Sequence, residues 1–372
     1  MNCAGYAGTL IVTPLQLSSG VMTQYSVSRH MHASTAPGHR IATLRGIYVG
    51  ACILLAAISS VGEAQRRSDT SSTVWKDSSP HRVGFIGVPG HRVQFLDWGG
   101  SGPPLVLLHG WNSNGHIFDD IAPRLAKNFR VVALSLPGFG ESDAPDSGYV
   151  LNTAADAVVR ALDSLSIRRA SFAGHSFGGW ILSRVATRHP TRVARLIYLD
   201  AACALSRSDS IVALRPLARP ALVDVTTQDD VIRWLRNNFF GMWSPALEAE
   251  YRGRSVEEAQ RAPLLKPIVA DARLASEEWS RIRVPVLGIC ALATVSSEFP
   301  WLPPRDRQFP KARTYVDSVR RPFQHSECIR FQKTVPSAQI LELPGHHYIF
   351  IAHREAIVAS MRAFLLGKRG IE

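Results

Sequence analysis

The sequence has few cysteines, and none of their spacings is typical of a metal or redox site. Its 372 residues include five cysteines without a Cys-x-x-Cys pair. Cys3 and Cys52 lie in the first 64 residues, which leaves Cys203, Cys290 and Cys328. These three allow one disulfide, but an odd number without a recognisable spacing predicts neither a disulfide framework nor a zinc site. No nucleotide-binding motif is present either, and we expect no metal and no cofactor.

Acidic residues are fewer than basic ones. The chain contains 30 Asp and Glu against 42 Lys and Arg, which gives a formal net charge of +12. A nucleic-acid-binding surface would need clustered Lys and Arg with interleaved aromatic residues, but here the arginines are scattered and no such block occurs. We attribute the charge to the general surface and do not expect nucleic acid as a partner. The hydrophobic share of 46% is ordinary for a globular protein.

An uncharged apolar run at residues 47–61 is shorter than the roughly 20 residues that a membrane-spanning helix requires. It follows Arg40 and Arg45 and precedes a Gly-Glu-Ala tripeptide that ends at Ala64. A basic region, an apolar core and small residues at the cleavage site form the order of a secretory signal peptide. We predict that residues 1–64 are an export signal and that the protein is periplasmic or secreted. A retained N-terminal anchor is the alternative, and no other integral membrane domain is expected.

The stretch before Arg40 is long for a signal peptide, so Met22 and Met31 are alternative starts. Residues 65–80 are rich in Ser, Thr and Asp and predict a flexible linker to the folded domain. The sequence leaves the oligomeric state open.

Strand and helix patterns alternate in the rest of the chain. Two alternating runs at residues 82–88 and 92–98, separated by Pro89-Gly90-His91, predict a hairpin. Apolar runs predict buried strands, and amphipathic spacing predicts helices between them. The predicted strands are residues 105–108, 131–136, 169–173, 195–199, 284–291 and 338–343, and the predicted helices are 117–127, 153–165, 180–188 and 355–366. This alternation predicts an α/β fold, with a mostly parallel sheet and helices on both faces.

The segment Gly174-His175-Ser176-Phe177-Gly178-Gly179 stands between a predicted strand and a predicted helix. Its Gly-x-Ser-x-Gly core is typical of a nucleophile elbow, a strained strand-to-helix turn that exposes a serine hydroxyl. Such a turn tolerates almost no side-chain bulk two residues before and after the serine, where this chain has glycine. A glycine-rich turn in an ordinary strand-helix unit is the alternative. We interpret Ser176 as a nucleophile.

Two further motifs support this interpretation. His109-Gly110-Trp111 follows one predicted strand, and Pro137-Gly138-Phe139-Gly140 follows the next, before the serine motif follows the third. The three motifs in this order resemble the α/β-hydrolase superfamily, and the likeness covers residues 82–200 and 284–366.

The resemblance implies an α/β-hydrolase fold with a core of residues 81–200 and 284–372. Residues 201–283 would be inserted as a helical cap over the active site, and residues 298–330 could add a second flap. Apolar side chains of the cap are candidates either to line an acyl pocket or to pack the cap onto the core: Trp234, Phe239, Phe240, Met242 and Trp243.

A serine hydroxyl needs a base within hydrogen-bond reach, and the base needs an orienting acid. In the superfamily these residues follow the chain order Ser, acid, His. The base should therefore follow the last strand, where Pro344-Gly345-His346-His347 stands. The family pattern Gly-x-His selects His347, with His346 as the competing choice. By the same resemblance His109 and His175 are structural neighbours of the site.

The acid departs from the commonest family pattern. Its usual place, after the strand at 284–291, reads Leu-Ala-Thr-Val, and Glu298 is the first acid beyond it. Some relatives, including haloalkane dehalogenases, carry the acid after the strand that follows the elbow helix, and that position here is Asp200. We favour Asp200 over Glu298, and a degraded or absent acid is the third possibility.

The tetrahedral intermediate of acyl transfer needs two backbone N–H donors for its oxyanion. The resemblance assigns these donors to Phe177, after the serine, and to Trp111, after His109-Gly110.

These residues predict an exported serine hydrolase that cleaves a carboxylic ester of a small-molecule acyl substrate through an acyl-enzyme. The sequence does not decide between esterase, lactonase, amidase, carbon–carbon hydrolase and perhydrolase. Dehalogenases and epoxide hydrolases use an aspartate where this chain has Ser176, and are disfavoured. The alternative from another class is a non-catalytic ligand-binding protein with the same fold, which the acid missing from its usual place suggests.

Overall fold

The computed structural model describes residues 80–367 except 89, 112, 145–148, 203–210, 212, 222–226, 239, 241–242, 253–270 and 272–274. The predicted export segment, and the predicted linker up to residue 79, lie outside the described residues. Among the helices that the structure describes, none is both long and apolar enough to cross a bilayer.

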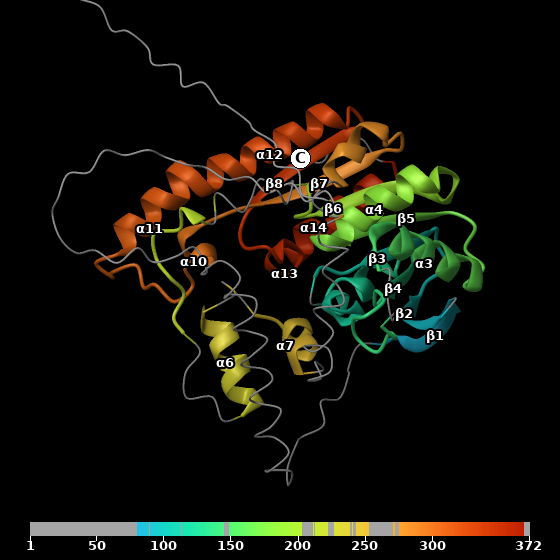
Figure 1. The fold of residues 1–372 in the computed structure, drawn as a ribbon, viewed down its shortest axis with the longest axis horizontal. Helices are drawn as coiled ribbons and strands as arrows, with labels where there is room; N and C mark the ends of the chain where they lie inside the picture. The colour runs from blue at the N-terminus through green and yellow to red at the C-terminus, as the bar shows by residue number, and fades with distance from the viewer. Residues whose placement is uncertain are drawn as a thin grey trace, which may run out of the picture. The chain divides into compact units, whose positions relative to one another are not determined.

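A single eight-stranded sheet organises the described part of the chain, in the order β1-β2-β4-β3-β5-β6-β7-β8 (Figure 1). The β1-β2 and β2-β4 pairs are antiparallel, and every pair from β4 to β8 is parallel. The strands are β1 Arg82–Val88, β2 His91–Gly99, β3 Pro104–Leu108, β4 Arg130–Leu134, β5 Ala170–His175, β6 Val193–Leu199, β7 Val286–Leu292 and β8 Ala338–Pro344. The mostly parallel sheet confirms the predicted fold class.

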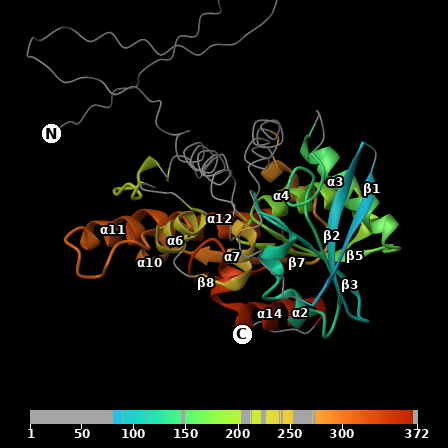
Figure 2. The ribbon, with the colours of Figure 1, turned by 90° about the horizontal axis from the view of Figure 1, so that it is seen from below.

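Helices cover both faces of this sheet (Figure 2). On one face pack α3 (Leu151–Ser164), α4 (Phe177–Arg188) and α12 (Arg321–Thr334). On the other face pack α2 (Ala122–Leu125), α13 (Ile349–Ala352) and α14 (Arg354–Leu365).

The apolar runs form central strands because both of their faces are covered. Successive side chains of a strand point to opposite faces. In β3, Val106 and Leu108 pack on the α3/α4 side, whereas Leu105 and Leu107 pack on the α2/α14 side. All four are at most 1% exposed, which explains why the run contains no polar residue.

The helix predicted over residues 117–127 is wrong in its extent. The structure has a 3₁₀ turn, η1 (Gly115–Phe118), followed by the short helix α2. Pro123 lies in the first turn of α2, where its missing N–H costs nothing. A continuous helix would have placed that proline in the interior, where it removes a hydrogen bond and clashes with the preceding turn.

Residues 298–330 do not form a second flap along their whole length. Their described elements are the end of α10 (Val295–Glu298), α11 (Phe309–Tyr315), a π-helical turn η5 (Val316–Arg320) and the first part of α12. Helix α12 is the crossover between β7 and β8. Its buried Phe331 stacks edge-on against Tyr198 of β6 at 4.9 Å, and a disulfide joins its Cys328 to Cys290 of β7.

The predicted cap segment lies between β6 and β7. Its described helices are α6 (Gln228–Asn238), α7 (Pro245–Arg252) and the 3₁₀ helix η4 (Ala275–Arg281). Phe240 and Tyr251 are both buried, with ring centroids 5.7 Å apart, and the Phe240 ring lies 5.0 Å from that of Tyr348 in the β8–α13 loop. Packing against the core therefore accounts for Phe240, one of the candidate pocket aromatics.

Candidate active site

The turn at Ser176 has the geometry of a nucleophile elbow. Ser176 links β5 directly to α4 with φ 51° and ψ −117°, a left-handed conformation that non-glycine residues rarely adopt. A Cβ on Gly174 would lie 2.7 Å from the backbone carbon of Gly178, and a Cβ on Gly178 would lie 2.4 Å from the carbonyl oxygen of Leu108. The two glycines therefore allow the strained turn to sit against strand β3.

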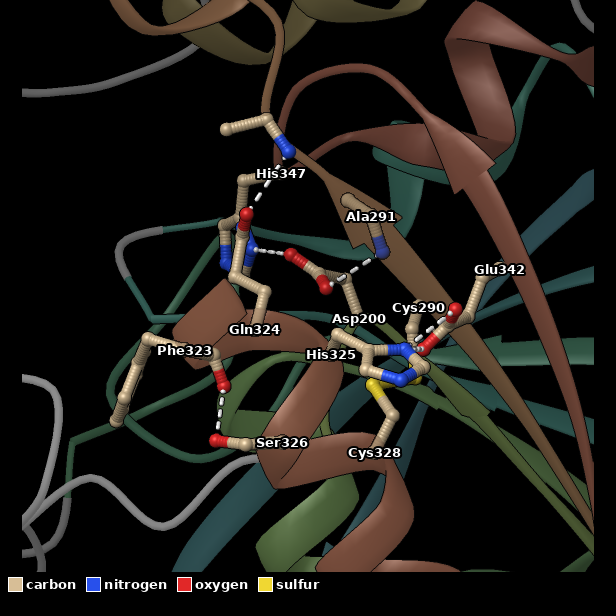
Figure 3. Close-up of a disulfide and its surroundings, with 11 residues drawn as sticks. Asp200, Cys290, Ala291, Phe323, Gln324, His325, Ser326, Cys328, Glu342 and His347 are labelled. Carbon is tan, nitrogen blue, oxygen red and sulfur yellow. Dashed lines mark hydrogen bonds and ion pairs between the residues drawn. A yellow bond between two sulfur atoms is a disulfide. The ribbon is translucent and has the colours of Figure 1, made fainter. Parts of the chain in front are cut away.

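Asp200 and His347 come together from the ends of β6 and β8. The Nδ1 atom of His347 lies 2.6 Å from Oδ2 of Asp200 (Figure 3). The other carboxylate oxygen, Oδ1, accepts a hydrogen bond from the Ala291 N–H at 2.9 Å. The Asp200 N–H donates to the carbonyl of Ile289 at 2.7 Å. Strand β7 thus holds both the backbone and the side chain of this aspartate.

This hydrogen bond determines which nitrogen of His347 can act as a base. A carboxylate only accepts hydrogen bonds, so the Nδ1 atom that faces it carries the proton. The Nε2 atom then keeps its lone pair. His347 is about half exposed, and this nitrogen can accept a proton from a hydroxyl group in the neighbouring cavity.

Glu298, the alternative acid, lies in a different set of contacts. Its carboxylate oxygens are 3.4 Å from Nε of Arg215 and 3.5 Å from Nε of Arg320. The structure therefore brings Asp200, and not Glu298, to the candidate base.

Ser176, Asp200 and His347 line one cavity of about 230 Å³. Its other lining residues are Trp180, Ala201, Ala202, Cys290, Ala291, Arg320, Gln324 and Cys328. The cavity is large enough for a small acyl chain, and it opens onto the serine and the histidine at once.

The other histidines near this cavity hold the backbone around it. The Leu136 N–H donates to Nε2 of His109 at 2.8 Å, so Nδ1 of His109 carries the proton and donates to the Gly110 carbonyl at 2.7 Å. His175 donates from Nε2 to the carbonyl of His347 at 3.1 Å. Burial, together with the charge of His347, holds the pKa of His175 well below its usual value, which keeps the ring neutral.

His346, the competing base, is buried and turned away from this role. Its Nδ1 atom accepts the Tyr348 N–H at 3.0 Å. Burial, and secondarily the charge of His347, lowers the pKa of His346 to about 4. A group with that pKa is a weak base at neutral pH.

The side chains of the two residues predicted to supply the oxyanion donors are in contact. The rings of Trp111 and Phe177 meet edge to face at 5.4 Å. The backbone at Gly110, the residue before Trp111, passes so close to the elbow that an added Cβ would lie 3.2 Å from Cβ of Ser176. Phe177 is also the first residue of α4, where backbone N–H groups have no acceptor within the helix.

Three features of the site region were not foreseen from the sequence. The disulfide between Cys290 and Cys328 forms part of the cavity wall. Ser113, just after the loop of Trp111, donates to Oε2 of the fully buried Glu250 of α7 at 2.8 Å. Arg320 and Gln324 reach the cavity from the helix that was expected to be a flap. The sequence did carry a sign of this arrangement: residues 320, 324 and 328 are spaced four apart, which places them on one face of a helix.

Among the residues that the structure describes, no group of three or more His, Cys, Asp or Glu side chains could hold a metal ion.

Comparisons with known proteins concern the family and the fold. A family model described as alpha/beta hydrolase fold matches residues 103–258. The human serine hydrolase-like protein is 34% identical over 143 residues, which cover 38% of this chain and 70% of that protein. The 2-hydroxymuconate semialdehyde hydrolase of Pseudomonas sp. (strain CF600) is 39% identical over 129 residues, which cover 34% of this chain and 45% of that protein.

The match to the curated relatives is confined to part of their length. A protein of Mycobacterium phage D29 is 40% identical over 113 residues, and this chain spans 41% of it. Among solved structures, E-2-(acetamidomethylene)succinate hydrolase superposes with a TM-score of 0.58 at 17% identity, covering 77% of this chain and 99% of that one. That likeness concerns the fold.

Proposed function

Because the chain belongs to the α/β-hydrolase family, we propose that it is a serine hydrolase that cleaves a carboxylic ester through an acyl-enzyme intermediate. The substrate is a small molecule with an acyl group. The observation that carries the proposal is the 2.6 Å contact between His347 and Asp200, beside a cavity that Ser176 also lines.

In the acylation step, the Ser176 hydroxyl attacks the ester carbonyl while Nε2 of His347 takes its proton. Asp200 keeps the histidine in the tautomer that permits this transfer and stabilises the imidazolium that forms. Collapse of the tetrahedral intermediate breaks the ester bond, and the imidazolium returns the proton to the departing alcohol. The product of this step is an acyl ester of Ser176.

In the deacylation step, a water molecule takes the place of the alcohol. His347 removes its proton, and the hydroxide attacks the acyl carbonyl. The tetrahedral intermediate collapses, the carboxylic acid leaves, and the His347 imidazolium returns its proton to the Ser176 oxygen.

The negative charge on the intermediate needs fixed donors in both steps. We assign these to the N–H groups of Phe177, the residue after Ser176, and of Trp111, the residue after Gly110, whose backbone approaches Ser176. Removing one such donor in other serine hydrolases costs about 10²–10³ in kcat. Hydrogen-bond donors that are already oriented stabilise this charge without reorganisation, so the rigid packing of Phe177, Trp111 and Phe139 supports the assignment.

The test is turnover of p-nitrophenyl esters of increasing acyl length by the full chain and by Ser176→Ala. We expect turnover by the wild type that falls by at least about 10³ in the variant. A wild type that turns over no ester of the series, and that a fluorophosphonate also fails to modify, would contradict the proposal and favour the ligand-binding alternative.

We also propose that the protein is exported, because the order of residues 1–64 matches a cleavable signal. N-terminal sequencing of protein from the extracellular or periplasmic fraction should then begin at Gln65. Recovery there of chains that still begin at Met1 or Met31 would contradict cleavage after Ala64.

A further inference from the structure

One face of the crossover helix is directed at the cavity. Arg320, Gln324 and Cys328 are spaced four residues apart and all line it. Arg320 ends the π-helical turn η5, and α12 begins at the next residue. A π turn inside a helix shifts the register of the side chains that follow, and such turns are frequent at functional sites.

The Arg320 guanidinium has an incomplete set of partners. Its one charged contact is the 3.5 Å approach of Nε to Glu298, and within the described part of the chain it makes no hydrogen bond. Glu298 is shared with Arg215, so two cations face one carboxylate. The charge of Arg320 is among the causes that lower the pKa of Arg215, after burial, as expected where positive charge is in excess.

Among the described residues of the cavity wall, no other acidic group compensates this charge. Asp200 is the one carboxylate among the lining residues that the structure describes, and both of its oxygens are already occupied by His347 and Ala291. The side chain of Arg320 is 23% exposed, so it is accessible while being partly shielded from water.

Gln324 adds hydrogen-bond donors on the same side. Its Oε1 atom accepts the Ala293 N–H at 2.8 Å, which fixes the orientation of the amide (Figure 3). The NH₂ group of that amide is then left with two N–H donors. A guanidinium and an amide NH₂ one helical turn apart match the oxygen atoms of a carboxylate.

Much of the remaining cavity wall is apolar. It includes the disulfide, Ala201, Ala202, Ala291 and Trp180. A methylene chain can therefore occupy the cavity while an anionic group reaches Arg320.

We propose that the natural substrate is an anionic ester, whose carboxylate binds Arg320 and the amide of Gln324 while its ester carbonyl meets Ser176. This inference rests on the proposed serine hydrolase function. The carboxylate belongs either to the acyl half or to the alcohol half of the ester, and the two halves are tested separately.

The test compares matched pairs of esters on the full-length protein. For the acyl half, mono-p-nitrophenyl adipate is paired with the p-nitrophenyl ester of the same chain ending in an isopropyl group, which replaces the carboxylate by a neutral group of the same shape. For the alcohol half, para-acetoxybenzoate is paired with para-isopropylphenyl acetate. The measured quantity is the ratio of kcat/KM within each pair, for wild type, Arg320→Gln and Arg320→Lys.

We expect the wild type to prefer the anionic ester in at least one pair. Arg320→Gln should lower that ratio by about 10- to 100-fold, the range for a lost hydrogen bond to a charged group. Arg320→Lys should recover part of it, because the charge is kept and the fork-shaped geometry is lost. Arg313→Gln is the matched control, since it removes an exposed arginine of α11 and should leave the ratio unchanged.

Two results would overturn the inference while the proposed function stands. One is Ser176-dependent turnover with no preference for the anionic ester in either pair. The other is a preference that survives Arg320→Gln.

If no ester is turned over, the proposed function fails instead, and binding then decides the inference. Calorimetry with adipate measures binding to Ser176→Ala and to the same protein carrying Arg320→Gln. Binding that weakens at least tenfold with the second substitution supports the anion site, and equal binding or no binding overturns it.

Discussion

The substitution Asp200→Asn tests the assignment of the acid, because the structure dictates how the new amide would be oriented. The Ala291 N–H donates to Oδ1 of Asp200 at 2.9 Å, so the amide oxygen of asparagine would occupy that position. The amide NH₂ group would then face Nδ1 of His347, where the carboxylate oxygen now lies at 2.6 Å. A donor at that place forces Nδ1 to accept and moves the imidazole proton to Nε2.

With its proton on Nε2, His347 cannot accept the proton of Ser176. In the chymotrypsin-type triad the same change of aspartate to asparagine lowers kcat by about 10⁴ through the wrong tautomer. We therefore expect kcat/KM to fall by about 10³–10⁴, which corresponds to about 4–5.5 kcal/mol of transition-state stabilisation. The fold should be retained, since asparagine still accepts the Ala291 N–H.

The assay is steady-state hydrolysis of a p-nitrophenyl ester, with the thermal midpoint recorded for each variant. Glu298→Gln removes the alternative acid and should keep at least about a tenth of the activity, because Glu298 contacts Arg215 and Arg320 and not the histidine. Our reasoning is refuted if Asp200→Asn remains within about tenfold of wild type, or if the large loss occurs only in Glu298→Gln.

Three further predictions concern stability. Gly178→Ala should lower the free energy of unfolding by about 1–3 kcal/mol, because the added Cβ would lie 2.4 Å from the Leu108 carbonyl oxygen. An unchanged urea midpoint would contradict this. The Cys290–Cys328 disulfide closes a loop of 38 residues, so its reduction should lower the free energy of unfolding by about 4 kcal/mol according to the chain-entropy relation. Equal urea midpoints with and without dithiothreitol would contradict this. Burial lowers the pKa of His346 from 6.5 to about 4, so the unfolded chain binds the extra proton between these values. The free energy of unfolding should therefore decrease by up to about 3 kcal/mol as the pH is lowered from 6.5 to about 4. His346→Gln should show a smaller decrease over the same pH range, and an equal decrease in both proteins would refute this prediction.

The parts of the fold that depend on residues close together in the sequence were predictable. Gly174 and Gly178 stand two residues from Ser176, and the close contacts that require them are made within the elbow and with the adjacent strand. The buried strands were predictable because a strand covered on both faces carries an unbroken apolar run, as residues 105–108 do.

The sequence favoured Asp200 but left Glu298 open as the acid, because the contact with the histidine depends on how distant strands are paired. Asp200 and His347 are 147 residues apart, and they meet because β6, β7 and β8 are adjacent and parallel. The pairing of Leu199 with Ile289 places Asp200 directly beside the Ala291 amide. Local patterns contain no information on that register.

The disulfide and the contacts of Arg320 were missed for a related reason. Both depend on α12 crossing from β7 to β8 against the sheet, whereas the Pro- and Arg-rich composition before it suggested a flap. Once α12 is placed, the four-residue spacing of Arg320, Gln324 and Cys328 follows one side of the helix and reaches the cavity.

The most direct test of the central claim is to find where a fluorophosphonate attaches. This reagent forms a covalent bond with a serine that is activated by a neighbouring base, and peptide mass spectrometry locates the adduct. We predict one adduct, on the peptide that contains Ser176, with the rate of labelling strongly reduced in His347→Gln. A wild-type protein that stays unlabelled, or one labelled on a different residue, would contradict a serine mechanism at this site.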